Sequence, residues 1–272
     1  MKKKTFYEPD YRRLNREAKE QKTRPGYRQP GAIMDRLLPN NRPDPITTDP
    51  ELFKEISGLI RAIRQQADWE QDLFEASYVV FDTETTGLHP FKGDEIISIG
   101  AVLVENNKIL DRPVFLRMVN PRRPISVKSK QITGISDSML EKQPQIMPVL
   151  KDFLKFCGPR ILVAHNAPFD LAFLNLKLGE ACGDRIVNPV IDTVLLTSAL
   201  YYHLEDYSLE NLSGHFGFSL EGRHEALSDA MITATLFLKL LSALRDRDIT
   251  TLPRLAGLFS DLDLSRGYPL IF

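Results

Sequence analysis

Residues 78–87 read Tyr-Val-Val-Phe-Asp-Thr-Glu-Thr-Thr-Gly, an apolar run followed by two acids and then by loop residues. The β-branched and aromatic residues at 78–81 predict a short buried strand. Side chains alternate along a strand with a period of two, so the carboxylates of Asp82 and Glu84 should share one face. Two neighbouring acids raise each other's proton affinity unless a cation lies between them. The stretch therefore predicts a strand that ends either in an ordinary polar loop or in a cation site.

The segments on either side of this stretch predict a layered α/β domain. Further strands are expected at 95–104, 109–119, 161–164 and 190–194, with a polar hairpin turn at 105–108. Helical spacing of apolar residues predicts helices within 49–72, 139–154 (in two pieces, because of Pro144 and Pro148), 171–178, 195–202, 209–216 and 226–244. Three consecutive strands followed by alternating helices and strands predict a mixed sheet with helices packed on it.

A second acid-bearing segment lies at the carboxyl end of the predicted strand 161–164. It reads His-Asn-Ala-Pro-Phe-Asp at 165–170 and opens a predicted helix. The carboxyl ends of strands are where α/β sheets place ligand sites, which makes Asp170 a candidate ligand. An acid in the first helical turn is also stabilised by the helix dipole by ~0.3–1 kcal/mol, which would explain Asp170 without a ligand.

The third segment, His-Glu-Ala-Leu-Ser-Asp at 224–229, spans the start of another predicted helix. His224 should lie just before that helix and Asp229 one turn inside it, so both can face one cleft. A solvated loop histidine and a first-turn acid would be the plainer explanation. Oxygen ligands without a cysteine cluster suit Mg²⁺ or Mn²⁺ rather than zinc. Carboxylates that hold two such cations, with a histidine to accept a proton from water, are the parts that phosphodiester hydrolysis needs.

Composition separates a basic arm from an acidic body. Residues 1–43 carry 12 Lys/Arg against 5 Asp/Glu, although the whole chain has a net charge of −1. This arm is either a solvated tail or a segment that meets nucleic acid phosphates or a protein partner. Two cysteines without a CxxC or HExxH spacing argue against a disulfide framework and a zinc site. No uninterrupted apolar run approaches the ~18 residues of a membrane span, and the N-terminus has no secretory signal pattern, so we expect a cytoplasmic protein without membrane contact.

The three acid-bearing segments, taken in order, resemble the exonuclease motifs of the DEDDh family. These segments are Phe-Asp-Thr-Glu-Thr-Thr-Gly at 81–87, the hexapeptide at 165–170 and the hexapeptide at 224–229. The family includes the proofreading epsilon subunit of bacterial DNA polymerase III, and Gln-Ile-Thr-Gly-Ile-Ser at 131–136 resembles its segment between the first two motifs. The resemblance covers about residues 77–242 and implies an RNase H-like fold with a mixed five-stranded sheet flanked by helices. Asp192 matches a further acid of the family, for which we expect a structural role.

The resemblance also implies a role for each motif residue, beginning with two divalent cations, Mg²⁺ or Mn²⁺. Asp82 should bridge both cations, Glu84 and Asp229 should complete the tighter site, and Asp170 should hold the second through water. His224 should act as the general base, because a tyrosine at that position would mark the sister subgroup. Substrate contacts are expected at Thr83, Thr85, Thr86, His165, Asn166 and Phe169. For the last three residues, packing within the loop explains the sequence equally well.

We expect four regions: a basic arm at 1–45, a helical extension at 46–76, an exonuclease domain at 77–244 and a C-terminal segment at 245–272. The function that the resemblance implies is 3′→5′ exonuclease activity on nucleic acid 3′ ends, with release of nucleoside 5′-monophosphates. DNA is favoured over RNA, in proofreading with a DNA polymerase subunit or in repair. An exoribonuclease of the RNase T or oligoribonuclease type is the alternative within the class. A non-catalytic nucleic-acid-binding subunit is the alternative of another class, disfavoured because all five candidate catalytic residues are present.

Overall fold

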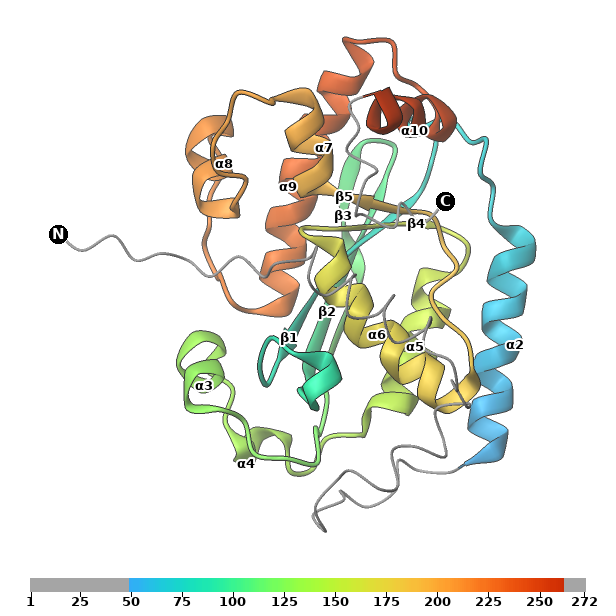
Figure 1. The fold of residues 1–272 in the computed structure, drawn as a ribbon, viewed down its shortest axis with the longest axis vertical. Helices are drawn as coiled ribbons and strands as arrows, with labels where there is room; N and C mark the ends of the chain where they lie inside the picture. Colours follow the sequence, from blue (N-terminus) through green and yellow to red (C-terminus); the bar gives the residue numbers. More distant parts are fainter. Residues whose placement is uncertain (1–48, 262–272) are drawn as a thin grey trace, which may run out of the picture.

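The five strands form one mixed sheet in the computed structural model, which describes residues 49–261. They are β1 (Tyr78–Thr85), β2 (Ile96–Glu105), β3 (Lys108–Met118), β4 (Ile161–Ala164) and β5 (Val190–Asp192). Their order in the sheet is β3-β2-β1-β4-β5 (Figure 1). The pairs β1–β2 and β2–β3 are antiparallel, whereas β1–β4 and β4–β5 are parallel. The predicted α/β class with a mixed five-stranded sheet is confirmed.

Most of the helices lie where the apolar spacing predicts them. They are α2 (Pro50–Gln66), α4 (Asp137–Leu140), α5 (Ile146–Cys157), α6 (Ala167–Cys182), α7 (Thr193–Leu200), α8 (Leu209–Phe216) and α9 (Ala226–Arg245). Three further elements were not predicted: the 3₁₀ helix η3 (Pro90–Lys92), α3 (Val127–Thr133) and α10 (Leu252–Asp261). The break predicted between 139 and 154 is present, because Pro144 precedes α5 and Pro148 lies in its first turn, where proline is tolerated.

The last strand is shorter than predicted, and a helix cap explains the difference. Val194 was expected in the strand 190–194, but it belongs to α7. Asp192 Oδ1 accepts the backbone N–H of Val194 at 2.9 Å, which is the geometry of a helix N-cap. The chain therefore turns from strand to helix directly at Asp192.

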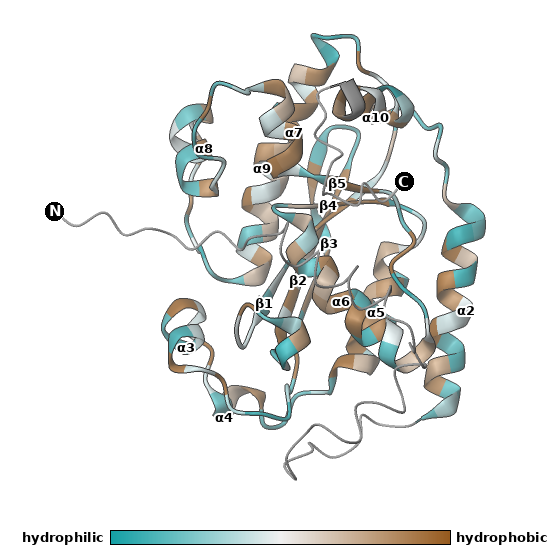
Figure 2. Cartoon of the chain, viewed as in Figure 1, coloured by the Kyte–Doolittle hydropathy of each residue, from teal (hydrophilic) through white to brown (hydrophobic). Residues whose placement is uncertain are grey.

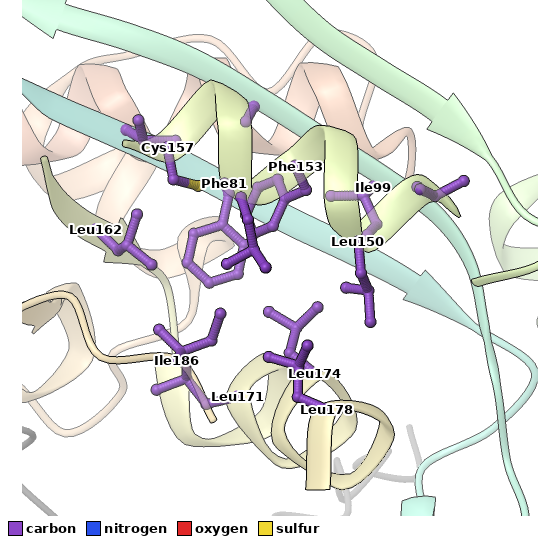
Figure 3. Close-up of a cluster of buried hydrophobic side chains, with 14 of the residues drawn as sticks. Phe81, Ile99, Leu150, Phe153, Cys157, Leu162, Leu171, Leu174, Leu178 and Ile186 are labelled. Carbon is purple, nitrogen blue, oxygen red and sulfur yellow. The ribbon is translucent and has the colours of Figure 1, made fainter. Parts of the chain in front are cut away.

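Helices cover both faces of the sheet and enclose two hydrophobic cores. On one face α2, α5 and α6 pack over β1 and β2, and Figure 3 shows part of this core around Phe81 and Phe153. On the other face α7, α8, α9 and α10 pack over the alternate residues of the strands, such as Tyr78 and Val80 of β1, whose side chains point away from the first core. The apolar residues coloured brown in Figure 2 follow the inward sides of these helices. Because β1 contributes to both cores, it is the central element of the domain.

The segments that flank the predicted exonuclease domain share these cores. Ile56, Ile60 and Ile63 of α2 are buried against α5 and α6, and Leu255 of α10 is buried in the core on the opposite face. The described parts of 46–76 and 245–272 are therefore packed onto the domain. The predicted basic arm at 1–45 and the residues after 261 lie outside the described residues.

Helix α9 is the longest element against the sheet. Within residues 49–261 it is the single helix long and apolar enough to cross a membrane by length and composition, and more than half of that stretch is buried in the domain. Residues of α9 such as Phe237 and Leu240 are fully buried in the second core. The apolar character of α9 thus follows from its central place in the packing.

Candidate active site

Three carboxylates meet where β1 passes the beginning of α9. Asp82, Glu84 and Asp229 each offer an oxygen atom, and these atoms lie within 4.8 Å of one another. Asp82 and Glu84 have the phase of Tyr78 and Val80 along β1, so they point toward the face that α9 covers. Asp229 lies in the first turn of α9, as predicted. The predicted pair and the acid of the third motif therefore form one cluster.

A glycine in β2 allows α9 to approach this cluster. Gly100 pairs with Asp82 across the β1–β2 ladder. A Cβ atom at Gly100 would lie 2.2 Å from the backbone N of Leu227 and 2.3 Å from the carbonyl carbon of Ala226. These distances are too short for any side chain, so the start of α9 lies directly on the strand at this point. Gly100 thereby fixes the distance between the acids of β1 and Asp229.

Asp170 reaches the same end of β1 from the opposite face. Its Oδ1 accepts two hydrogen bonds from Thr83, one from the backbone N–H at 3.0 Å and one from the hydroxyl at 2.6 Å. Thr83 points toward the α6 side because it alternates with Asp82 and Glu84. Asp170 is therefore adjacent to the three-carboxylate cluster but is not one of its members. The structure brings all four predicted acids to one end of β1 from two sides.

Burial and mutual repulsion favour the protonated forms of Asp82, Glu84 and Asp170. Burial, together with the charges of Asp229 and Asp170, raises the pKa of Glu84 to about 8. Burial likewise raises the pKa of Asp170 to about 7, against the hydrogen bonds from Thr83, and the pKa of Asp82 well above its usual range. A divalent cation would remove the repulsion that, with burial, produces these shifts.

The buried carboxylate of Asp229 shows how a cation would fit. Its Oδ2 accepts hydrogen bonds from Arg223 Nη1 at 2.6 Å and from the backbone N–H of His224 at 3.1 Å. Its Oδ1 is buried and has no hydrogen-bond partner among the described residues. A buried carboxylate oxygen without a donor is costly unless a cation or water satisfies it. The donor set of three close carboxylates with one unsatisfied oxygen therefore suits a hard divalent cation.

His224 lies in the turn just before α9, as predicted. It is exposed, and its backbone has a left-handed conformation with φ of 69°. A non-glycine residue adopts that conformation only where its surroundings hold it. The backbone N–H of His224 donates to Asp229 Oδ2 at 3.1 Å, so the exposed residue adjoins the acid cluster through its backbone.

The loop of the second motif is built around inward-facing side chains. The His165 ring bonds to the Thr193 hydroxyl at 2.8 Å, and burial lowers its pKa to about 4. Phe169 stacks on Phe173 with ring centroids 5.2 Å apart. The backbone N–H of Asn166 donates to Asp192 Oδ1 at 2.9 Å, so the expected structural role of Asp192 is confirmed. These contacts favour loop packing for His165 and Phe169, and substrate contact at 165, 166 and 169 stays a prediction.

The threonines after Glu84 also use their side chains internally. The Thr85 hydroxyl donates to the carbonyl of Gly87 at 2.7 Å. The Thr86 hydroxyl donates to Asp94 Oδ1 at 3.1 Å and accepts the backbone N–H of Glu95 at 3.0 Å. All three threonines of the motif are buried, so the contact of Thr83, Thr85 and Thr86 with a nucleotide stays a prediction.

Comparison with known proteins assigns the family. The RNase_T model, described as "Exonuclease", matches residues 79–237, which is more than half of the chain. The chain belongs to this exonuclease family. The sequence resemblance to the DEDDh exonucleases is confirmed, and the chain is an exonuclease by family.

The names of two curated relatives refer to DNA polymerase III. A DNA polymerase III subunit epsilon-like protein of Rhodobacter capsulatus is 45% identical over 184 residues, which cover 67% of this chain and 26% of the relative. The PolC-type DNA polymerase III of Bacillus subtilis is 42% identical over 180 residues, which cover 65% of this chain and 12% of the relative. The exonuclease thus spans about a quarter of one relative's length and about an eighth of the other's.

Solved structures share the fold. The nuclease domain of 3'hExo, a DEDDh family member bound to rAMP, aligns with a TM-score of 0.55 at 20% identity and covers 63% of this chain and 94% of that one. E. coli Exonuclease I in complex with a dT13 oligonucleotide aligns with a TM-score of 0.52 at 15% identity, over 63% of this chain and 42% of that one. These likenesses confirm the predicted RNase H-like fold.

Sequence reasoning missed two features of the site. Gly100 could have been recognised, because a glycine inside a strand often marks a close backbone approach. Arg223 gives no such signal, because an arginine beside a loop histidine is unremarkable until its two carboxylate partners are known.

Proposed function

We propose that this exonuclease removes nucleotides from the 3′ end of DNA and releases nucleoside 5′-monophosphates with the help of two divalent cations, Mg²⁺ or Mn²⁺. The single observation that carries the proposal is the cluster of three carboxylates whose ligand oxygens lie within 4.8 Å of one another; one of them, Asp229, also has a buried oxygen, Oδ1, without a hydrogen-bond partner among the described residues. The hydrogen bonds to Asp229 occupy its Oδ2 and leave Oδ1 without a donor among the described residues. The raised pKa of Glu84, about 8, supports a cation as its natural partner.

The residues divide the chemistry among them. Asp82, Glu84 and Asp229 would hold one cation, and Asp82 with Asp170 would hold the second. When bound, such a cation pair stabilises the charge that develops on the attacking water and on the leaving oxygen. His224 would accept the proton of the attacking water on a ring nitrogen, since the residue is exposed and its backbone N–H contacts Asp229 of the cluster. Thr83 keeps the Asp170 carboxylate oriented through its two hydrogen bonds.

The choice of DNA and of a polymerase partner rests on the relatives. The epsilon-like and PolC-type relatives carry polymerase names, which supports DNA as the polymer and replication in the cytoplasm as the setting. The basic residues at 1–43 would aid binding of nucleic acid or of that partner, because the rest of the chain is acidic. Deletion of residues 1–43 should weaken DNA binding and flatten its salt dependence, and copurification with a polymerase subunit would test the partner.

A direct assay compares 5′-labelled DNA and RNA of the same sequence, single-stranded and with a 3′ mismatch, in Mg²⁺ or Mn²⁺. We expect a ladder shortened from the 3′ end, faster on DNA, and no cleavage in EDTA. Asp82→Ala should abolish cleavage, whereas Asp152→Ala, a change of an exposed acid on α5, should not. Full activity of Asp82→Ala would refute the assignment of the active site. Release of the labelled 5′ nucleotide first would refute the 3′→5′ direction. Faster cleavage of RNA than of DNA would favour an exoribonuclease.

A further inference from the structure

The guanidinium of Arg223 joins two helices across the turn that carries His224. Its Nη1 donates to Asp229 Oδ2 at 2.6 Å. Its Nε and Nη2 donate to Glu210 Oε1 on α8 at 3.2 and 2.8 Å. We name this three-residue arrangement the α8 bridge. It ties α8 to the first turn of α9 through a single planar group, which is the fork geometry that arginine provides and lysine does not.

The turn that the bridge spans needs to be held. Gly222 and His224 both have positive φ, at 78° and 69°. Glycine adopts this conformation readily, but histidine does so at an energetic cost that the surroundings must offset. The His224 backbone N–H donates to Asp229 Oδ2, the same oxygen that Arg223 contacts. Arg223 therefore supports the oxygen that in turn supports the backbone of His224.

The bridge also distinguishes the two oxygens of Asp229. Oδ2 receives both donors, whereas the buried Oδ1 receives none among the described residues. A carboxylate held in this way keeps Oδ1 in a fixed direction. Positioning of a metal ligand by a hydrogen-bonded neighbour is a general property of metal sites.

We propose that Arg223 is a positioning residue and that Glu210 is its anchor, so that the α8 bridge holds His224 and Asp229 Oδ1 in the orientation that cleavage requires. The proposal rests on the proposed function and extends it to a residue of α8 that belongs to none of the three motifs. The bridging geometry carries the effect, since the positive charge alone would be retained by a lysine. Glu210 is half-exposed, with 52% of its side chain accessible, so its ion pair should add little to global stability.

The test compares Glu210→Gln, Arg223→Lys, Arg223→Gln and the double variant Glu210→Gln/Arg223→Lys. Hydrogen–deuterium exchange of residues 219–225 is measured in the metal-free protein, and kcat and KM are measured on single-stranded DNA with Mg²⁺. We expect exchange to be about tenfold faster in each single variant, because the turn opens more often. We expect kcat to fall about 10- to 100-fold with KM nearly unchanged, since the reacting groups lose their alignment. The exchange rate and kcat of the double variant should lie within about twofold of those of the more impaired single variant, because both changes break the same bridge.

The control is Arg64→Gln on α2, which removes another exposed arginine ion pair, with Asp184 at 3.0 Å, on the opposite side of the sheet. It should change neither exchange at 219–225 nor kcat. Wild-type exchange and turnover in Arg223→Lys, or in Glu210→Gln, would overturn the proposal, as would losses that multiply in the double variant. Because Glu210 is half-exposed, its variant should fold even if an Arg223 variant does not. The exchange experiment needs no nuclease activity, so failure of the bridge and failure of the proposed function give different results.

Discussion

Substitution of Gly100 by alanine should displace the start of α9 and disable the site. The added Cβ would lie 2.2 Å from the backbone N of Leu227, and ordinary contact begins at 3.4 Å. Helix α9 must therefore move by about 1.2 Å, because the atoms it meets are backbone and cannot rotate away. Overpacking of this kind costs about 1–3 kcal/mol of unfolding free energy.

The effect on the site follows from the ligand geometry. Two oxygens on one Mg²⁺ ion lie at most about 4.2 Å apart, since each bond is about 2.1 Å long. The oxygens of Asp82, Glu84 and Asp229 lie within 4.8 Å, so a small closure would bring them onto one ion. A further 1.2 Å or so at Asp229 would place it outside that range. A misplacement of about 1 Å can lower the rate about 100-fold, and we expect a loss of that size in kcat for Gly100→Ala.

The assay pairs exonuclease turnover with urea denaturation. Gly58→Ala is the matched control, because Gly58 lies within α2 and a Cβ there would meet nothing within 4 Å. That variant should keep its turnover, and its unfolding free energy should rise by up to about 1 kcal/mol, since alanine has a higher helix propensity than glycine. Gly100→Ala with wild-type turnover and stability would refute the inferred close approach of α9 to β2.

Three other changes test different parts of the structure. Without metal, the unfolding free energy measured by urea denaturation should fall as the pH rises from about 4.5 to about 8, because Glu84 keeps a proton in the folded protein that it loses in the unfolded chain. Mg²⁺ should flatten this dependence on pH. An unfolding free energy that does not change with pH in the absence of metal would contradict the prediction. His224→Gln should lower kcat by about 10²–10⁴ while Mg²⁺ still raises the melting temperature, so undiminished turnover would remove His224 from catalysis. Lys177→Met should lower the unfolding free energy by about 3–5 kcal/mol in urea denaturation, because it leaves Glu95 without the ammonium that lies 2.7 Å away. A decrease below about 1 kcal/mol would show that Glu95 finds another partner.

The sequence predicted those elements whose signals are local. Strand 161–164 and helix 209–216 match β4 and α8 residue for residue, since apolar spacing and flanking breakers define both. Helix α3 was missed because its stability comes from contacts rather than from apolar periodicity. The Ser126 hydroxyl caps it by accepting the N–H of Ser129, and the Ser129 hydroxyl donates to the carbonyl of Thr85 at 2.7 Å. The cap was readable, but the contact with the first motif was not.

The candidate site was predictable in its members and less so in its arrangement. Alternation along β1 placed Asp82 and Glu84 on one face, and position in the first turn placed Asp229 near them. The separation of Asp170 from the other three acids required knowledge of which helix covers which face of the sheet. The role of Arg223 could not be predicted for the same reason, because its partners, Glu210 and Asp229, belong to two different helices. Tertiary packing, which sequence periodicity does not encode, decides these details.

Strand β1 pairs on one side with β2, which follows it directly in the chain, and on the other with β4, which comes much later, and this difference affects the order of folding. β1, β2 and β3 follow one another directly, whereas β4 and the helices that carry Asp170 and Asp229 come much later in the chain. Loop-closure entropy favours early formation of the local meander, so Asp82 and Glu84 are solvated until the late long-range contacts form. Electrostatic repulsion then opposes mainly the step after the transition state. Asp82→Asn should accordingly slow unfolding and leave refolding nearly unchanged, which stopped-flow kinetics would reveal, and equal effects on both rates would contradict this order of assembly.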